Sequence, residues 1–343
     1  MPPFLLQRAI ENLGSVRALP DAPVGSEAAH RFAFSWDVAT RIEVALSARD
    51  GRLLECRAPT ADLLQGDDEL VVRYQGRQSA ADWALPERVA ILRRGIEVMG
   101  VRLLDIQRNV ALEDAAFAPP AAFRAYELPA EPPVVEVSPG IFEVRELGGG
   151  TYRSQIIVRD ADVLVFESLG PGLAPRVLAA AKKLAGTRPI SHVVVSHFHA
   201  DHAGGVGVFA RNGITVISPA GQRAVLERYT RSSYSGAALV SPPTAVPTIA
   251  EVGDRLLLEA PDRPIEIFNV GGNPHVDGML VLYDRKSRTL INADLFSLYS
   301  PFNETFESLI KWLDRTRLPV EWVLGTHHDP LKLEEIRRRF RTR

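Results

Sequence analysis

The stretch Ser196-His197-Phe198-His199-Ala200-Asp201-His202 places three histidines and an aspartate within six positions. It follows residues 190–195, a β-branched segment bounded by Pro189 that is typical of a buried strand. Alternate side chains of an extended segment share a face, so His197 and His199 can point at one metal ion. The stretch therefore predicts a metal site at the end of a strand.

Asp201 and His202 come where the chain turns towards Ala203-Gly204-Gly205, so they can reach a second ion beside the first. Neutral imidazoles and carboxylates are ligands of zinc, iron and manganese. A lone histidine such as His30 or His192 is more often a structural residue than a ligand. Burying three imidazoles and a carboxylate together without a metal would be costly, because their polar groups would lack partners. The pattern therefore favours a metal centre.

The run resembles the hallmark His-x-His-x-Asp-His motif of the metallo-β-lactamase superfamily, and the resemblance extends from about Pro133 to the C-terminus. It implies an αββα sandwich, in which two mixed sheets lie back to back with helices outside and metals at one edge. It also implies further ligands in a fixed order along the chain.

Each of these implied ligands has a candidate. His275 lies in the turn-rich segment 270–278 and would complete the first site with His197 and His199. Asp294 follows an apolar strand and matches the bridging carboxylate of the family, which offers one oxygen to each cation.

The final ligand of the second site is implied in the segment Thr326-His327-His328-Asp329, which also follows an apolar strand. Two histidines compete there. We prefer His327, because it comes directly after the strand and a short turn, and we keep His328 as the alternative.

The ligand set implies two zinc ions per chain, with iron or manganese as alternatives. Two ions roughly 3.5 to 4 Å apart lower the pKa of a shared water towards 7 and polarise a carbonyl or phosphoryl oxygen of the substrate. The resemblance indicates Asp201 as the catalytic residue that orients the nucleophile and carries its proton to the leaving group. These features predict a hydrolase that uses a metal-bridged hydroxide.

The substrate is expected to be a small molecule with an ester, thioester, lactone or related carbonyl group. Asp294 stands where the best-known zinc-dependent β-lactamases carry a cysteine, and Cys56 lies far upstream. The ligand set is instead similar to that of hydroxyacylglutathione hydrolases (glyoxalase II) and lactonases. Tyr299, after the bridging aspartate, is a candidate for substrate binding, and the Ser/Pro-rich passage 232–247 is expected to overhang the site. Glu167, after a core strand, departs from the family pattern with no clear consequence.

Two other classes of protein remain as alternatives. One is an oxidoreductase: a persulfide dioxygenase-like branch of the superfamily uses a single iron, whereas flavodiiron members usually replace the second histidine of the run, which His199 retains. A complete second site favours two metals and hydrolysis over the persulfide reaction. The other is a binding protein with a vestigial site.

Composition fits a soluble enzyme. The chain has 343 residues, 46% of them hydrophobic, and its net charge of −2 gives no electrostatic case for nucleic acid or an anionic membrane. The single cysteine excludes an intramolecular disulfide. No apolar stretch is long enough to span a bilayer and the start lacks the pattern of a signal peptide, so a cytoplasmic protein is expected. A periplasmic protein whose leader had been removed would give the same pattern.

We predict two domains, residues 1–130 and 131–343, joined through a segment rich in Ala and Pro between Glu113 and Val134. In the first, apolar residues at helical spacing up to Gly14 predict a short helix. Alternating apolar residues around Asp50-Gly51, a hairpin turn, predict an antiparallel β domain. Its expected role is a packing or dimerisation platform, which allows a homodimer.

The second domain carries the elements of the sandwich. Its predicted strands are 141–144, 155–158, 163–166, 214–217, 256–258, 265–268, 280–283 and 289–292. Its predicted helices are 174–184, 222–229, 306–313 and 334–340.

Overall fold

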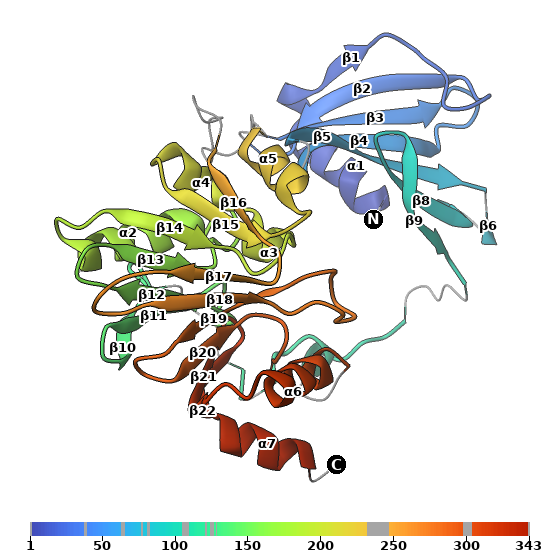
Figure 1. Cartoon of the computed structure of the whole chain (residues 1–343). Coiled ribbons are helices and arrows are strands. Elements are labelled where there is room, and N and C mark those ends of the chain that lie inside the picture. The colour runs from blue at the N-terminus through green and yellow to red at the C-terminus, as the bar shows by residue number, and fades with distance from the viewer. Residues whose placement is uncertain are drawn as a thin grey trace. The chain divides into compact units, whose positions relative to one another are not determined.

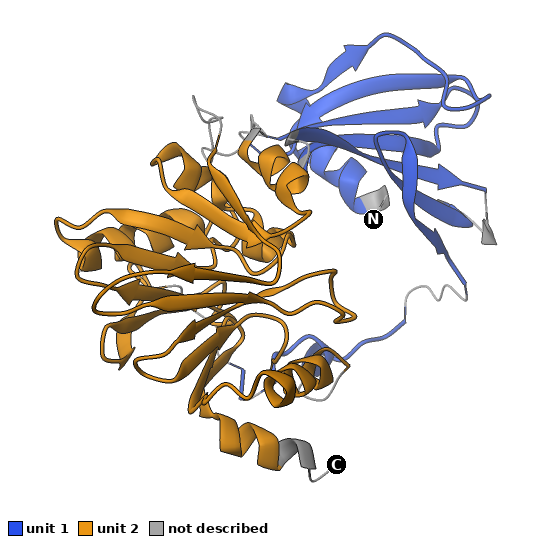
Figure 2. Cartoon of the chain, viewed as in Figure 1, with its two compact units in different colours: residues 1–123, 234–238 blue, residues 124–233, 239–343 orange. Residues whose placement is uncertain are grey.

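The computed structural model describes residues 2–37, 40–62, 66–76, 78–80, 83–104, 110–120, 122–123, 127, 129–231, 247–297 and 304–341. These residues form two compact units (Figure 2). Unit 1 contains the described part of residues 1–123, and unit 2 the described parts of 124–233 and 239–343.

Unit 1 is built on a seven-stranded sheet in which every pairing is antiparallel. The strands lie in the order β1 (Arg17–Leu19), β2 (Ala29–Ser35), β3 (Arg41–Ser47), β4 (Leu53–Asp62), β5 (Gly66–Gln75), β8 (Arg88–Arg93) and β9 (Ile96–Arg102). β6 (Gln78–Ala80) and β7 (Trp83–Leu85) pair separately, and a 3₁₀ turn, η2, spans Asp114–Ala116. The predicted antiparallel β-rich domain ahead of the sandwich is confirmed.

One helix covers part of this sheet (Figure 1). α1 (Pro2–Glu11) packs its Leu5, Leu6 and Ala9 against apolar side chains of the strands, and a 3₁₀ turn, η1 (Leu13–Ser15), follows it. The predicted hairpin turn joins β3 to β4, and there Gly51 adopts a φ of +70°, which glycine accepts without steric cost.

Unit 2 contains a seven-stranded sheet and a six-stranded sheet. The first has the order β10 (Val134–Ser138), β11 (Ile141–Leu147), β12 (Tyr152–Val158), β13 (Val163–Phe166), β14 (Ile190–Val194), β15 (Thr215–Pro219) and β16 (Ile249–Val252). Its pairings are antiparallel from β10 to β13 and parallel from β13 to β16.

The second sheet has the order β17 (Arg255–Leu258), β18 (Ile265–Asn269), β19 (Leu280–Asp284), β20 (Thr289–Asn292), β21 (Trp322–Gly325) and β22 (His328–Lys332). Only β20 and β21 pair in parallel; the other pairings in this sheet are antiparallel. Both sheets are therefore mixed, as the sequence predicts.

Unit 2 has four layers. The two sheets pack face to face through an apolar core that includes Phe166 and Ile217 from the first sheet and Ile267 and Leu282 from the second. Burying each such side chain stabilises the fold by about 1.5 to 3 kcal/mol. The described helices are α2 (Ala174–Ala185), α3 (Ala200–Ala203), α4 (Val206–Arg211), α5 (Arg223–Arg231), α6 (Glu304–Thr316) and α7 (Leu333–Arg341).

Helices cover the outer faces of the two sheets (Figure 1). α2 and α4 contact strands of the first sheet. α6 packs its Phe306, Leu309 and Leu313 against the outward side chains of the second sheet, such as Tyr283. This arrangement is the predicted αββα sandwich.

The parallel strands fix where chemistry can occur. β13, β14 and β15 run in one direction, so their carboxyl ends share an edge of the first sheet, and β20 and β21 do the same in the second. Loops that leave such an edge commonly build binding sites in α/β proteins.

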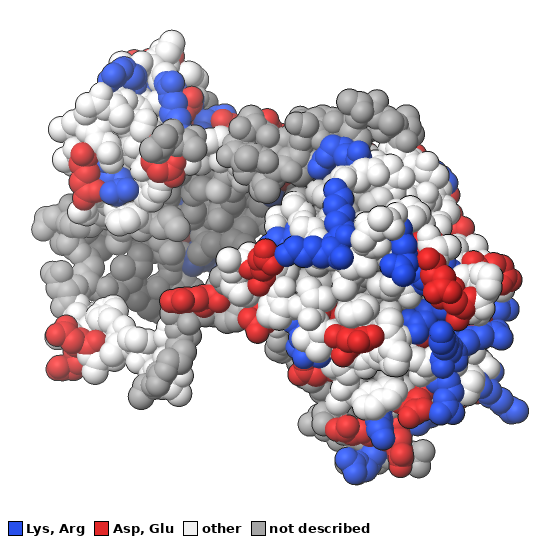
Figure 3. Space-filling model, turned by 90° about the vertical axis from the view of Figure 1, so that its left-hand side faces the viewer, with Lys and Arg blue, Asp and Glu red and all other residues white. Residues whose placement is uncertain are grey.

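Charged side chains of both signs are interspersed over the described residues on the face shown in Figure 3, in keeping with the net charge of −2. Among the described residues, no helix combines the length and apolar character that crossing a bilayer requires.

Candidate metal centre

The histidine run lies at the carboxyl end of β14, in the parallel part of the first sheet. β14 ends at Val194, and α3 begins at Ala200 with His199 as its N-cap residue. Asp201 and His202 lie on α3. The start of this short helix therefore separates Asp201 and His202 from His197 and His199. This agrees with the prediction that the two pairs of residues belong to different metal sites.

A first group of donors contains His197, His199, His275 and Asp294, whose ligand atoms all lie within 4.8 Å of one another. His275 Nε2 lies 3.2 Å from His197 Nε2. His275 reaches this position because the Asn273 side chain accepts hydrogen bonds from the backbone N–H groups of His275 and Val276, which fixes the loop after β18.

A second group contains Asp201, His202 and His327, again with ligand atoms within 4.8 Å of one another. His202 Nε2 lies 3.4 Å from Asp201 Oδ2 and 3.5 Å from His327 Nε2. Asp201 and His202 come from α3, whereas His327 comes from the turn between β21 and β22. The second group therefore joins the two sheets.

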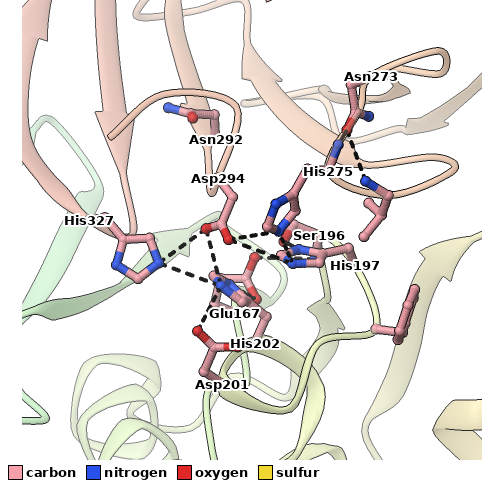
Figure 4. Close-up of polar contacts among 12 residues, drawn as sticks. Glu167, Ser196, His197, Asp201, His202, Asn273, His275, Asn292, Asp294 and His327 are labelled. Atoms are coloured by element: carbon pink, nitrogen blue, oxygen red, sulfur yellow. Dashed lines mark hydrogen bonds and ion pairs between the residues drawn. The ribbon is translucent and has the colours of Figure 1, made fainter. Parts of the chain in front are cut away.

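Asp294, a member of the first group, also contacts the second group (Figure 4). Its Oδ2 is 3.1 Å from His275 Nε2 and 3.7 Å from His197 Nε2, whereas its Oδ1 is 3.1 Å from both His202 Nε2 and His327 Nε2. Burial favours its neutral form, but hydrogen bonds from His202, His275 and His327 hold the pKa of Asp294 well below its usual range. The carboxylate thus offers one oxygen to each group.

His328, the alternative ligand, lies outside both groups. Its Nδ1 donates to the backbone oxygen of Asp329 at 2.7 Å, and its Nε2 lies 3.2 Å from the side-chain nitrogen of Asn292. Burial lowers the pKa of His328 to about 4, so the ring is neutral and accepts through Nε2. Of the two candidates, the structure brings His327 to the centre and leaves His328 in the core.

The donor set fits divalent metal ions. Imidazole nitrogens and carboxylate oxygens converge, which suits zinc, iron or manganese. One buried oxygen at the centre, Asp294 Oδ1, receives no well-directed hydrogen bond from the described residues, although the Nε2 atoms of His202 and His327 lie 3.1 Å from it. Such groups are costly to bury unless something satisfies them, and a coordinated cation beside the carboxylate would do so.

Imidazole must be neutral to bind a metal. Burial, followed by the neighbouring His202, lowers the pKa of His197 to about 2. Burial and His275 lower the pKa of His199 below its ordinary value. Both rings are therefore available as ligands at neutral pH.

The surroundings of His202 favour positive charge. Its ring nitrogens lie 3.1 Å from Asp294, 3.4 Å from Asp201 and 3.5 Å from Glu167. Burial opposes protonation of His202, but these three carboxylates hold its pKa well above its usual range. A metal ion bound here would take the place of that proton.

Glu167 lies on the side of the His202 ring that faces away from the donor groups. It directly follows β13, it is fully buried, and its Oε2 faces His202 Nδ1, which leaves Nε2 directed at the centre. Its Oε1 accepts from the backbone N–H of Ser196 at 3.2 Å. Sequence analysis noted this residue but gave it no role. Its place at the carboxyl end of a strand next to the histidine run was the signal that could have identified it as a neighbour of the metal ligands.

Tyr152 contacts the second group of donors, and sequence analysis did not identify it. Its hydroxyl donates to Asp201 Oδ2 at 3.2 Å. Tyr299, the predicted substrate-binding residue, lies outside the described residues, and so do residues 232–246 of the passage 232–247 that is expected to overhang the site.

Comparison with known families agrees with this fold. The family described as "Metallo-beta-lactamase superfamily" matches residues 148–327, just over half of the 343 residues. The chain belongs to the metallo-beta-lactamase superfamily. Comparison with curated proteins gives no match.

Solved structures with similar folds include a metallo-beta-lactamase from Pontibacter korlensis, with 17% identity, a TM-score of 0.48 and coverage of 62% of this chain and 98% of that one. A stereoselective inverting sec-alkylsulfatase from Pseudomonas sp. has 18% identity and a TM-score of 0.45, and the match covers 61% of this chain and 40% of that one. The DIM-1 metallo-beta-lactamase has 16% identity and a TM-score of 0.48, and the match covers 62% of this chain and 96% of that one. At these identities the neighbours do not indicate a substrate for this chain.

Proposed function

We propose that this chain is a metal-dependent hydrolase that holds two ions and cleaves an ester, thioester, lactone or related carbonyl substrate. The observation that carries the proposal is the placement of Asp294. Its two oxygens face two separate donor groups, each 3.1 Å from at least one imidazole nitrogen. A carboxylate with this geometry is suited to bridge two cations.

The first ion would be held by His197, His199 and His275, and the second by Asp201, His202 and His327, with Asp294 between them. When bound, the ions would supply Lewis acidity towards the substrate oxygen and a water molecule whose pKa is lowered towards neutrality.

Asp201 is the residue proposed to handle the proton. Its side chain is 45% exposed, so it is accessible to water and substrate. The hydrogen bond from His202, the largest influence, lowers the pKa of Asp201 well below its usual range, so the carboxylate is ionised and can accept a hydrogen bond from water. From there it would orient the water and pass its proton to the leaving group.

Hydrolysis is favoured over the single-iron oxidoreductase because the second group is complete among the described residues. An oxidoreductase with one iron would need only the first group.

The test is a hydrolysis panel of thioesters, lactones, β-lactams and phosphodiesters, run on protein whose metal content is measured by mass spectrometry. We expect about two zinc ions per chain and turnover of a carbonyl substrate that a chelator abolishes. One iron per chain together with persulfide oxidation would contradict the proposal. Metal-loaded protein that turns over none of these substrates would count against hydrolysis.

A further inference from the structure

The segment that leads into β12 is folded tightly against the second donor group. Gly148, Gly149 and Gly150 all have positive φ values, of 55°, 76° and 84°. Glycine adopts this region readily, whereas other residues are strained there. At Gly148, a Cβ atom would come within 2.6 Å of the Tyr152 ring. The glycines therefore allow the loop to close on Tyr152.

Tyr152 contacts two members of the second group. Its hydroxyl donates to Asp201 Oδ2 at 3.2 Å, and its ring packs edge-on against the His327 ring, with centroids 5.0 Å apart. The neighbouring Thr151 oxygen lies 3.3 Å from His327 Nδ1, where it can accept from that nitrogen and leave Nε2 for a metal.

The strand that carries Tyr152 is also bonded to the turn that carries His327. The backbone N–H of Arg153 donates to the Thr326 oxygen at 2.9 Å, and the Gln155 side chain donates to the Gly325 oxygen at 3.2 Å. Arg153 also pairs with Asp329 at 2.7 Å. These bonds link the two sheets, so the position of Tyr152 is fixed relative to His327.

Asp201 needs such support more than its partners do. Its side chain is 45% exposed, whereas those of His202 and His327 are 0% and 14% exposed. An exposed side chain keeps rotamer freedom, and holding it in one ligating position costs entropy. A hydrogen bond from a fixed hydroxyl reduces that freedom before the metal arrives.

We propose that Tyr152 is a positioning residue for the second metal ion, holding Asp201 by its hydroxyl and His327 by its ring. This inference rests on the proposed two-metal hydrolase. Tyr152 then sets the affinity for the second ion and leaves the first unchanged, because both of its contacts belong to the second group.

The experiment compares zinc-loaded wild type with Tyr152→Phe, which removes the hydroxyl and keeps the ring. Both proteins are challenged with increasing chelator, and bound zinc is counted by mass spectrometry. Loss of a supporting hydrogen bond of this kind typically weakens metal binding by about 10 to 100-fold. We expect the second zinc to leave the variant at correspondingly lower chelator concentration, with the first unaffected. Tyr152→Leu, which also removes the ring, should release it more easily still.

Tyr283→Phe is the matched control. The Tyr283 hydroxyl donates to the Pro319 oxygen at 3.2 Å, the same length of bond in a different part of unit 2. Both ions should stay bound as in wild type. A general loss of stability would weaken both sites, so the separation between the two ions distinguishes positioning from a merely structural role.

The outcomes separate this inference from the proposed function. Two ions of unchanged affinity in Tyr152→Phe, or equal weakening of both, would overturn the role of Tyr152 and leave the hydrolase proposal standing. A wild type that binds one ion only would overturn both. Selective loss of the second zinc without hydrolysis of any substrate would support Tyr152 and contradict the function.

Discussion

Each unit of the molecule holds a carboxylate among cationic or basic partners, and the two clusters differ in what those partners are. In unit 1, Glu55 is 1% exposed and lies 2.7 Å from Arg57, 2.8 Å from Arg73 and 3.6 Å from Arg31. In unit 2, Asp294 is surrounded by imidazoles. The two clusters therefore place a buried carboxylate among side chains of different chemical capacity.

The difference lies in whether the partner can lose its proton. Guanidinium remains charged at any physiological pH and has no free lone pair, so an arginine cluster neutralises a carboxylate and binds no metal cation. Imidazole becomes a neutral donor when it gives up its proton. The comparison predicts that changes at Asp294 affect chemistry, whereas changes at Glu55 affect stability alone.

The largest effect is expected for Asp294→Asn. The amide keeps the shape but carries no charge to hold two cations, so metal occupancy should fall and hydrolysis should drop by about a thousandfold or more, corresponding to several kcal/mol of lost metal catalysis. Steady-state kinetics and metal analysis check this. The exposed Asp160, changed to Asn in the same way, should leave both unaltered. Wild-type turnover in Asp294→Asn would remove the proposed bridge.

Asp201→Asn should lower kcat by about a hundredfold or more, the range typical of a lost proton-transfer group. Because the side chain is not proposed to bind substrate, KM should change little. Metal content must be measured in parallel, since Asp201 is also a proposed ligand. An unaltered kcat in fully loaded protein would remove Asp201 from the proton pathway.

Glu167→Gln should have a smaller effect, because the change leaves every ligand in place. Loss of the carboxylate beside His202 Nδ1 should weaken zinc binding by about tenfold or more, as chelator competition would show. Glu143 is an equally buried glutamate, paired with Arg145 at 2.8 Å, and Glu143→Gln should leave zinc affinity unchanged. The same zinc affinity in Glu167→Gln as in wild type would argue against its positioning role.

Glu55→Gln should lower the free energy of unfolding of unit 1 by about 1 to 2 kcal/mol. The loss is moderate because Arg57 and Arg73 are partly exposed, so water can solvate their charges when the carboxylate is removed. Hydrolysis should be unchanged. The more exposed Glu69, which pairs with Arg57 at 2.8 Å, is the control, and Glu69→Gln should have little effect on unfolding. A loss of activity in Glu55→Gln would break the comparison between the units.

The same cluster predicts a dependence on pH. Burial would raise the pKa of Glu55, but hydrogen bonds from Arg73 and Arg57 hold it below its ordinary value of 4.5. The unfolded chain then binds more protons than the folded one, so this stabilisation is present above pH 4.5 and is lost as pH falls through the folded pKa. The difference between wild type and Glu55→Gln in urea unfolding should therefore shrink below that pH. A constant difference would indicate that the charge of Glu55 does not matter.

The smallest effect is expected at the edge strand of unit 1. Met99, in β9, is 55% exposed, so Met99→Lys should change the free energy of unfolding by less than about 0.5 kcal/mol. Urea unfolding at several protein concentrations checks this. A larger loss that depends on concentration would indicate that a second chain covers β9, as the predicted homodimer allows.

Strands buried on both faces were predictable, whereas some of the edge strands were not. β13 and β20 have the predicted bounds, because each is a short apolar run between two layers. β10 and β22 were missed. β10 exposes its first three residues, and β22 contains Pro330 and polar side chains that give no alternating pattern. Packing, rather than local sequence, defines such strands.

The candidate site divides in the same way. The run from His197 to His202 is contiguous and visible, and His275, Asp294 and His327 could be placed by their order along the chain. Their role as ligands stays a prediction. Tyr152 could not be found, because a single tyrosine 49 residues from Asp201 has no pattern, and only the order of β12, β13 and β14 within the first sheet brings it there.

The second donor group has a consequence for synthesis in the cell. His327 follows His202 by 125 residues, so at the usual rates of translation of about 5 to 20 residues per second roughly 6 to 25 seconds separate their appearance. During that interval the nascent polypeptide presents one half of a coordination sphere and lacks the other. Under the proposed function, the second ion would therefore find its complete set of ligands only after the C-terminal part of the chain has been made.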